Sequence, residues 1–333
     1  MAPLRIALIG AGKHGSRYAH HLVTDLASEA ELAVLCRRDR DAGAAAARRY
    51  GCRFTPDIDD AATASDVDAV VVVVPPTLHA AICARAAAAG KAILLEKPMA
   101  PSVADARRIG DALDRHRVPF MVAHTLRFNA VVRALRDRLV DIAPLVSVHL
   151  SQRFEPSQLG WLDDLAVAGG GIVIHTGVHS FDLLRFLTGS EVESASCRTW
   201  QRHTRATEDN FSAQLTLGGG VQATVTGSRS TEGRSGLIEL VGERGQLVGD
   251  HTLHFAYLIR GRARTALDLG SEVQTVREAL RAFVQSVGRD ARPPIGWPDG
   301  AAAVAVAEAC YRSAAAGRAE VPVLIRPSSI SGK

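Results

Sequence analysis

The feature that most constrains this chain is the alternation of short apolar segments with alanine-rich segments over its first 123 residues. Strands are predicted at 5–9, 32–36, 69–74, 92–95 and 119–123, with helices at 15–27, 41–50, 79–89 and 103–116 between them. The strand segments are too apolar to have a face in water, and each connection is long enough to cross back over the sheet as a helix. The pattern predicts a doubly wound parallel sheet covered by helices on both faces.

From about residue 145 the pattern changes to longer alternating segments separated by glycine-rich turns. Strands are predicted at 146–153, 193–201, 213–217, 222–226 and 237–241; one helix at 173–187 interrupts them, and two at 273–287 and 301–315 follow. We therefore expect an α/β protein with a first domain at 1–123 and a second at 124–333, the latter built on a mostly antiparallel open sheet. The C-terminal helices could pack back on the first domain, and the polar tail at 327–333 is expected to fray.

Composition removes several classes of protein. The longest apolar strand-like run, at 69–74, is far shorter than the roughly 20 residues of a membrane span, and the N-terminus leads directly into a strand without a signal-peptide pattern. The five cysteines are scattered and form no Cys-x-x-Cys pair, which fits a reducing cytoplasm and no structural zinc. The net charge of +4 is mild and the arginines are dispersed, so neither nucleic acid nor a membrane is an expected partner.

The first strand runs into Gly10-Ala11-Gly12-Lys13-His14-Gly15, a G-x-G-x-x-G pattern between a strand and a helix. Glycine is required there for a tight turn, for close approach of a dinucleotide pyrophosphate, and for packing of the helix on the strand. The helix N-terminus then faces the phosphates. In this context the pattern predicts a Rossmann domain that binds a nicotinamide dinucleotide.

The end of the second strand bears on the choice between NAD and NADP. An acidic residue about 20 positions beyond the glycines would bind the ribose hydroxyls of NAD, but Cys36 stands there, followed by Arg37 and Arg38. Two guanidinium groups suit the 2′-phosphate of NADP, so NADP is the preferred cofactor and NAD a possible one. The alternative is that the arginines form a solvated loop and Asp39 reaches the ribose.

Further segments are Val73-Val74-Pro75-Pro76-Thr77-Leu78-His79, Glu96-Lys97-Pro98 after the strand at 92–95, and Gly169-Gly170-Gly171 leading to His179. With the glycine pattern they resemble the Gfo/Idh/MocA oxidoreductase family over nearly the whole chain. The resemblance implies a Rossmann domain, a second α/β domain whose open sheet often forms homodimer or homotetramer contacts, and redox chemistry on a sugar, cyclitol or related polyol. It also implies that Lys97 lies beside the nicotinamide and assists proton transfer, and that the peptide before Pro98 is cis.

The chemistry independently requires a group such as Lys97, because a hydride leaving a carbinol carbon must be accompanied by loss of the hydroxyl proton. A lysine in a dry cleft near a positive ring is expected to have a lowered pKa, which arginine could not match. Lysine is also rare here: Lys13, Lys91, Lys97 and Lys333 are the four in a chain with 39 cationic residues.

The helix predicted after the glycine triplet carries His175, His179 and Asp182 at i, i+4 and i+7, on one face. His179 matches the family's substrate-binding or proton-relaying histidine, whereas His175 stands where the family commonly has aspartate. Both are candidate catalytic and substrate-binding residues, although either could be structural. A metal site is not expected, because a further ligand of suitable geometry is missing.

Other candidates are less specific. Arg127 could bind substrate or brace the domain junction, and Trp161 could stack on a polyol ring or take part in an interface. Pro75, Pro76, His79 and Glu96 are candidate cofactor-lining residues. The leading hypothesis is a cytoplasmic NAD(P)-dependent dehydrogenase or reductase acting on CH–OH groups. The alternatives are nicotinamide-assisted glycoside cleavage or epimerisation with internal hydride recycling, and a non-catalytic NADP-binding regulator.

Overall fold

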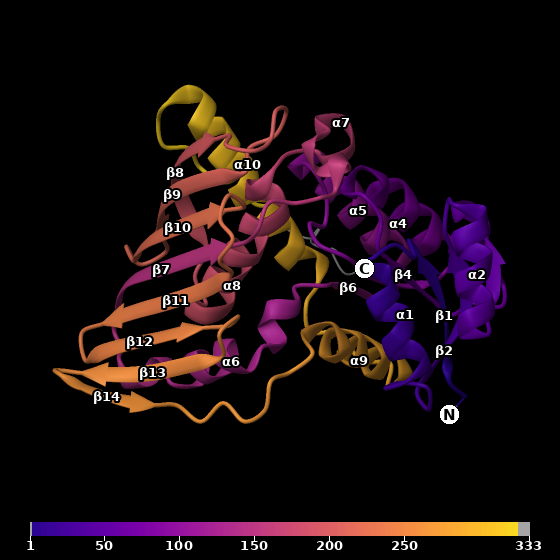
Figure 1. Ribbon diagram of the computed structural model, residues 1–333, viewed down its shortest axis with the longest axis horizontal. Helices are drawn as coiled ribbons and strands as arrows, with labels where there is room; N and C mark the ends of the chain where they lie inside the picture. Colours follow the sequence, from indigo (N-terminus) through magenta and orange to yellow (C-terminus); the bar gives the residue numbers. More distant parts are fainter. Residues whose placement is uncertain (1, 326–333) are drawn as a thin grey trace, which may run out of the picture. The chain divides into compact units, whose positions relative to one another are not determined.

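The computed structural model describes residues 2–325, and the predicted tail segment at 327–333 lies outside them. The chain forms two compact units: the first contains residues 2–124 and Val276–Ala301, and the second contains Thr125–Thr275 and Ala302–Leu324. Figure 1 shows one β-sheet in each unit. Among the described residues, no helix combines the length and the apolar character that crossing a bilayer requires.

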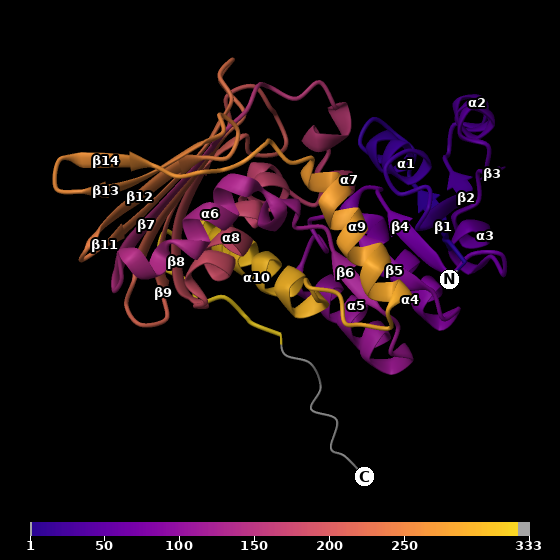
Figure 2. The same cartoon turned by 90° about the horizontal axis from the view of Figure 1, so that it is seen from below.

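The first unit is a six-stranded parallel sheet in the order β3-β2-β1-β4-β5-β6. Figure 2 shows α4 and α5 on one face of this sheet and α1 and α9 on the other. Because β1 and β4 are neighbours, the chain reverses its direction of winding between them, and their carboxyl ends border the crevice in which such sheets bind ligands. The elements are β1 (Leu4–Ile9), α1 (Gly15–Val23), β2 (Ala30–Cys36), α2 (Arg40–Tyr50), β3 (Arg53–Thr55), α3 (Ile58–Thr63), β4 (Ala69–Val72), α4 (His79–Ala88), β5 (Ala92–Leu95), α5 (Val103–His116), β6 (Phe120–Val122) and α9 (Thr275–Gly288).

The second unit is an eight-stranded sheet in the order β14-β13-β12-β11-β7-β10-β9-β8, in which β7 and β10 are parallel and the other neighbours antiparallel. Helices α6, α8 and α10 cover one of its faces (Figure 2). The elements are α6 (Ala130–Asp137), β7 (Leu145–Arg153), α7 (Leu165–Ala168), α8 (Val178–Thr188), β8 (Val192–Trp200), β9 (Asn210–Leu217), β10 (Gln222–Ser228), β11 (Ser235–Gly242), β12 (Gly245–Asp250), β13 (Phe255–Arg260), β14 (Ala263–Ala266) and α10 (Trp297–Ala316). Side chains buried against the helices alternate along β10 and β11 with side chains on the other face, as expected for a sheet with one covered face.

The predicted fold class is confirmed: a parallel Rossmann sheet is followed by a mostly antiparallel sheet. The predicted helix at 173–187 differs in one respect, because it begins with a π-helical turn, Val173–Gly177, before α8. A π turn contains more residues than an α turn, so the regular α-helical spacing assumed for His175, His179 and Asp182 does not apply across this turn.

Candidate functional site

The glycine loop after β1 fits a dinucleotide phosphate group. Gly10 has φ +102°, and a Cβ there would lie 2.1 Å from the carbonyl oxygen of Val73, at the end of the neighbouring strand. A Cβ at Gly15 would lie 1.9 Å from the Gly10 carbonyl oxygen, so helix α1 packs directly on the loop. A Cβ at Gly12 would meet no atom of the described chain within 4 Å, which leaves space over the loop for a pyrophosphate. Lys13 and His14, at the exposed end of the loop, border that space.

The residues after β2 carry positive charge close to the loop. The half-buried Arg37 donates a hydrogen bond of 3.1 Å to the carbonyl oxygen of Ala11, and Arg38 is exposed. Asp39 is the N-cap of α2 and accepts the Ala42 N–H at 3.0 Å, so this carboxylate has a helix-capping role. Burial raises the pKa of Cys36 to about 11, with further contributions from nearby aspartates, and the thiol supplies no negative charge to a ribose.

The loop after β5 places Lys97 next to a buried carboxylate. Glu96 is 6% exposed; one of its oxygens lies 2.7 Å from Nε2 of His14 and accepts the Tyr18 hydroxyl at 2.6 Å. Its other oxygen accepts the backbone N–H of Lys97 at 2.9 Å, and the Lys97–Pro98 peptide is cis. Within the first unit, the glycine loop and the lysine loop are therefore joined through Glu96.

Electrostatics keep Glu96 ionised. Burial would raise its pKa, but the hydrogen bond and charge of His14, the charge of Lys97 and the Tyr18 hydroxyl outweigh burial, and the pKa is lowered to about 2. The same carboxylate, together with burial, raises the pKa of Tyr18, which therefore remains a hydrogen-bond donor. The result is a fixed negative charge beside the half-buried Lys97.

His79, a candidate cofactor-lining residue, is held between two backbone carbonyl groups. Its ring has no exposed surface, and its two nitrogens lie 3.2 Å from the Met99 carbonyl oxygen and 3.0 Å from that of Val74. Desolvation lowers its pKa, so the ring is neutral and donates to one of these oxygens at a time. His79 joins the loop after β4 to the segment after Pro98. Pro76 is buried as well, while Pro75 is partly exposed.

In the second unit, His175 is buried in the π-helical turn. Its Nε2–H donates to the Ala168 carbonyl oxygen at 3.0 Å, and the edge of Trp161 packs against its ring with centroids 5.5 Å apart. His179, one helical turn further on, is half-buried. Trp161 thus contacts a candidate site residue directly, and the bond to Ala168 fixes which nitrogen of His175 carries a proton.

Arg127 and Asp182 form a buried ion pair. The guanidinium donates two hydrogen bonds, of 2.8 and 2.6 Å, to the carboxylate, and the two side chains are 12% and 2% exposed. The Arg127 guanidinium also lies 5.3 Å from the ring centroid of Phe186. This bidentate pairing anchors the 3-10 turn Thr125–Phe128 to α8.

A cavity of about 270 Å³ lies entirely within the second unit, beside His175. Its wall contains the loop 156–160, the start of the π-helical turn at Gly171 and Ile172, and the segment 203–209. Arg229, which directly follows β10, also lines it. A Cβ at Gly171 would lie 2.0 Å from the Glu208 carbonyl oxygen, which explains why the last position of the triplet must be glycine.

Sequence reasoning did not identify Arg229, Glu208 or Tyr311 as parts of this region. Glu208 accepts the backbone N–H groups of Gly171 and Val173 at 3.1 and 2.9 Å and the Tyr311 hydroxyl at 2.8 Å. Burial raises the pKa of Glu208. These residues lie 35 to 140 positions from their partners, so no local pattern could have indicated the contacts.

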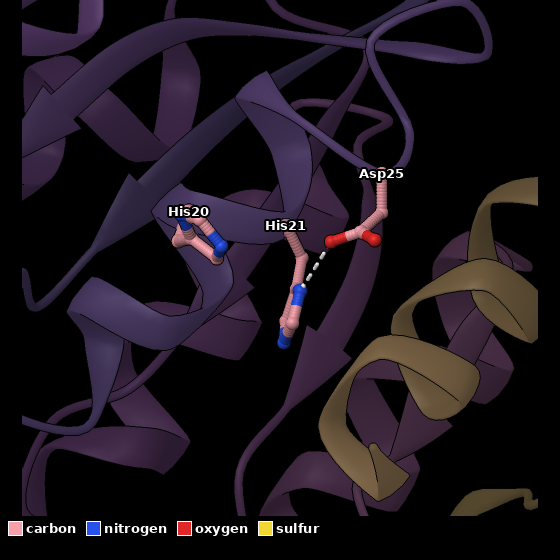
Figure 3. Close-up of side chains that lie close together, drawn as sticks. All are labelled: His20, His21 and Asp25. Atoms are coloured by element: carbon pink, nitrogen blue, oxygen red, sulfur yellow. Dashed lines mark hydrogen bonds and ion pairs between the residues drawn. The ribbon is translucent and has the colours of Figure 1, made fainter. Parts of the chain in front are cut away.

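One group of three candidate metal ligands occurs in the described part of the chain: His20, His21 and Asp25 (Figure 3), with ligand atoms within 4.8 Å of one another. Nδ1 of His21 lies 2.7 Å from Asp25, and this hydrogen bond lowers the pKa of the carboxyl group. The Arg277 guanidinium is 3.6 Å from the other oxygen of Asp25. The carboxylate therefore already has positive or proton-donating neighbours, and it ties the end of α1 to α9.

Both units match models of known protein families. The family model described as "Oxidoreductase family, NAD-binding Rossmann fold" matches residues 4–124, and the "GFO/IDH/MocA C-terminal domain" model matches residues 142–248. Inositol 2-dehydrogenase 2 of Saccharopolyspora erythraea is 32% identical, covering 97% of this chain and 96% of that protein. The chain belongs to the Gfo/Idh/MocA oxidoreductase family.

Inositol 2-dehydrogenase of Rhizobium meliloti is 29% identical to this chain, and the match covers 95% of this chain and 98% of that protein. The structure of levoglucosan dehydrogenase in complex with NADH and levoglucosan superposes on this chain with a TM-score of 0.89. The two sequences are 21% identical, and the match covers 96% of this chain and all of that one, so the similarity concerns the fold. These comparisons confirm the predicted family and the expected use of a nicotinamide cofactor. They also confirm the predicted enzyme class, an oxidoreductase acting on CH–OH groups.

Proposed function

We propose that this oxidoreductase transfers a hydride to or from a CH–OH carbon of a sugar or cyclitol, with Lys97 as the proton-transfer group. The inositol dehydrogenases among its relatives support this substrate class. The observation that carries the assignment of Lys97 is the chain of contacts from the glycine loop through His14 and Glu96 to the Lys97 backbone. It holds the lysine at the same sheet edge as the dinucleotide loop.

The roles of the remaining residues follow from this arrangement. A bound nicotinamide ring supplies or accepts the hydride. Lys97 takes the hydroxyl proton during oxidation or returns it during reduction. Glu96 and His79 hold the loops on either side, and His179 and His175 are the proposed partners on the substrate side, in a second domain that binds substrate while the first binds cofactor.

The test of this proposal is Lys97→Met, with Lys91→Met as the matched control. Lys91 donates to the Val67 carbonyl oxygen at 2.7 Å, away from the glycine loop. With a panel of inositols, sugars and their keto forms followed at the nicotinamide absorbance, we expect Lys97→Met to lower kcat by at least about 100-fold and to change cofactor affinity by no more than a few-fold. Unchanged kcat, or an equal loss in Lys91→Met, would remove Lys97 from the mechanism.

We also propose NADP as the preferred cofactor. Arg37 lies beside the glycine loop, Cys36 stands in the place of an acidic residue, and the carboxylate of Asp39 caps a helix. These features favour a phosphorylated ribose over a free one. We infer a cytoplasmic protein from the scattered, unpaired cysteines.

The uncovered face of the eight-stranded sheet is the proposed homodimer or homotetramer surface. It presents mainly small polar side chains on β9 and β10, with Tyr257 and Ile259 on β13. A sheet face of this size that no helix covers in the second unit suits pairing with an identical face. Light scattering of the purified protein tests this, and a monomer at micromolar concentration would contradict it.

A further inference from the structure

The cavity in the second unit contains a buried positive charge, that of Arg229. The Arg229 side chain donates one hydrogen bond, to Oγ1 of Thr176 at 2.9 Å, and forms no ion pair with a carboxylate among residues 2–325. Desolvation lowers its pKa, which the charge of Glu208 only partly offsets. Burying a guanidinium in this way costs free energy unless an anionic partner completes the site.

The acidic residues in the cavity wall are occupied by other donors. Asp163 accepts the backbone N–H groups of residues 205–207 at 2.8 to 3.1 Å. Asp209 accepts those of residues 202–204 at 2.7 to 3.3 Å. These hydrogen bonds lower the pKa of both groups, although burial opposes the shift at Asp209. Both carboxylates therefore stay ionised, and their oxygens are held by the backbone N–H groups of the loop that they fold.

Glu208, the third acid, faces two backbone N–H groups and the Tyr311 hydroxyl. Burial raises its pKa, and its charge acts on Arg229 without a direct ion pair between them. The guanidinium of Arg229, by contrast, can donate hydrogen bonds to an anionic oxygen in the cavity.

We infer that the substrate carries a carboxylate that Arg229 binds, so that the enzyme acts on a sugar acid in preference to the neutral sugar. This inference rests on the proposed function and narrows its substrate class. His175, in the same cavity wall, would face the hydroxyl-bearing part of the molecule. The volume of about 270 Å³ is near the lower limit for small-molecule pockets, roughly 300 to 1,000 Å³, and suits part of a monosaccharide acid.

The experiment compares matched acid and neutral substrates: glucuronate with glucose, galacturonate with galactose, and gluconate with sorbitol, each with NADP and NAD. We expect kcat/KM to favour the acid of at least one pair by about tenfold or more. Arg229→Met should reduce that preference by about 10- to 100-fold, the range for a lost charge-assisted hydrogen bond. Arg229→Lys, which keeps the charge, should retain part of it, and the exposed Arg234→Met should leave it unchanged.

Calorimetric titration with the same acids, without turnover, separates this inference from the proposed function. Turnover of neutral sugars or cyclitols in preference to acids, unaffected by Arg229→Met, would overturn the inference and leave the proposed function standing. Acid binding that is lost in Arg229→Met, without turnover of any substrate, would support Arg229 as the carboxylate-binding residue and contradict the proposed function. Absence of both acid binding and acid turnover in the folded wild type would overturn the inference.

Discussion

Removing Arg127 should cost this protein far more stability than removing an exposed arginine. The substitution Arg127→Met leaves the carboxylate of Asp182, which is 2% exposed, without the two hydrogen bonds that compensate its charge. Breaking a buried ion pair by truncating one partner costs about 3 to 5 kcal/mol. For units of 150 to 250 residues, each kcal/mol lowers Tm by roughly 2 to 4 °C, so the expected decrease is roughly 6 to 20 °C.

The control is Arg234→Met, which breaks the pair with Glu155, whose side chains are 56% and 44% exposed. Solvent screens an exposed pair, so Tm should fall far less than in Arg127→Met. The double substitution Arg127→Met with Asp182→Leu removes both charges and should recover most of the loss, because no charge then remains buried.

Differential scanning calorimetry of the three variants and the wild type is the assay. If Arg127→Met and Arg234→Met lower Tm equally, the reasoning from burial is wrong. The same variants test whether Arg127 binds substrate. A large rise in KM with an unchanged Tm would assign it to the cleft, whereas loss of Tm with little change in KM would assign it to the anchoring of α8.

Two further predictions concern the first unit. Because the pKa of Glu96 is about 2 in the folded state and about 4.5 ordinarily, its carboxylate contributes about 3 kcal/mol of stability above pH 4.5, and this contribution is lost as the pH falls from 4.5 toward 2. Glu96→Gln should therefore lower Tm at pH 7 and differ much less from the wild type near pH 3; an equal difference at both values would contradict the assignment. Replacing Arg37 and Arg38 together by Ala should weaken NADPH binding by about tenfold or more in calorimetric titration and change NADH binding by about threefold at most; equal losses would refute the role of these arginines at the 2′-phosphate.

Local chemistry made much of the first unit predictable. The strands there are buried on both faces, so they appear as continuous apolar runs, and the residues after each strand are confined to one sheet edge by parallel pairing. The predicted β5 and α5 coincide with the observed Ala92–Leu95 and Val103–His116. The short β3 and α3 were not predicted, because segments of three and six residues contain too little periodicity to stand out.

The contacts that give the candidate site its electrostatics were not predictable in this way. The sequence by itself determined the cofactor loop, the strand-end position of Lys97 and the change to an antiparallel second unit, because glycine geometry and hydrophobic periodicity act over a few neighbouring residues. Only the tertiary structure decided that Glu96 pairs with His14, that Asp182 pairs with Arg127, and that Arg229 lines a cavity with no direct ion pair to residues 2–325. Ion pairing and desolvation depend on which distant side chains meet, and that is settled only when the chain is folded.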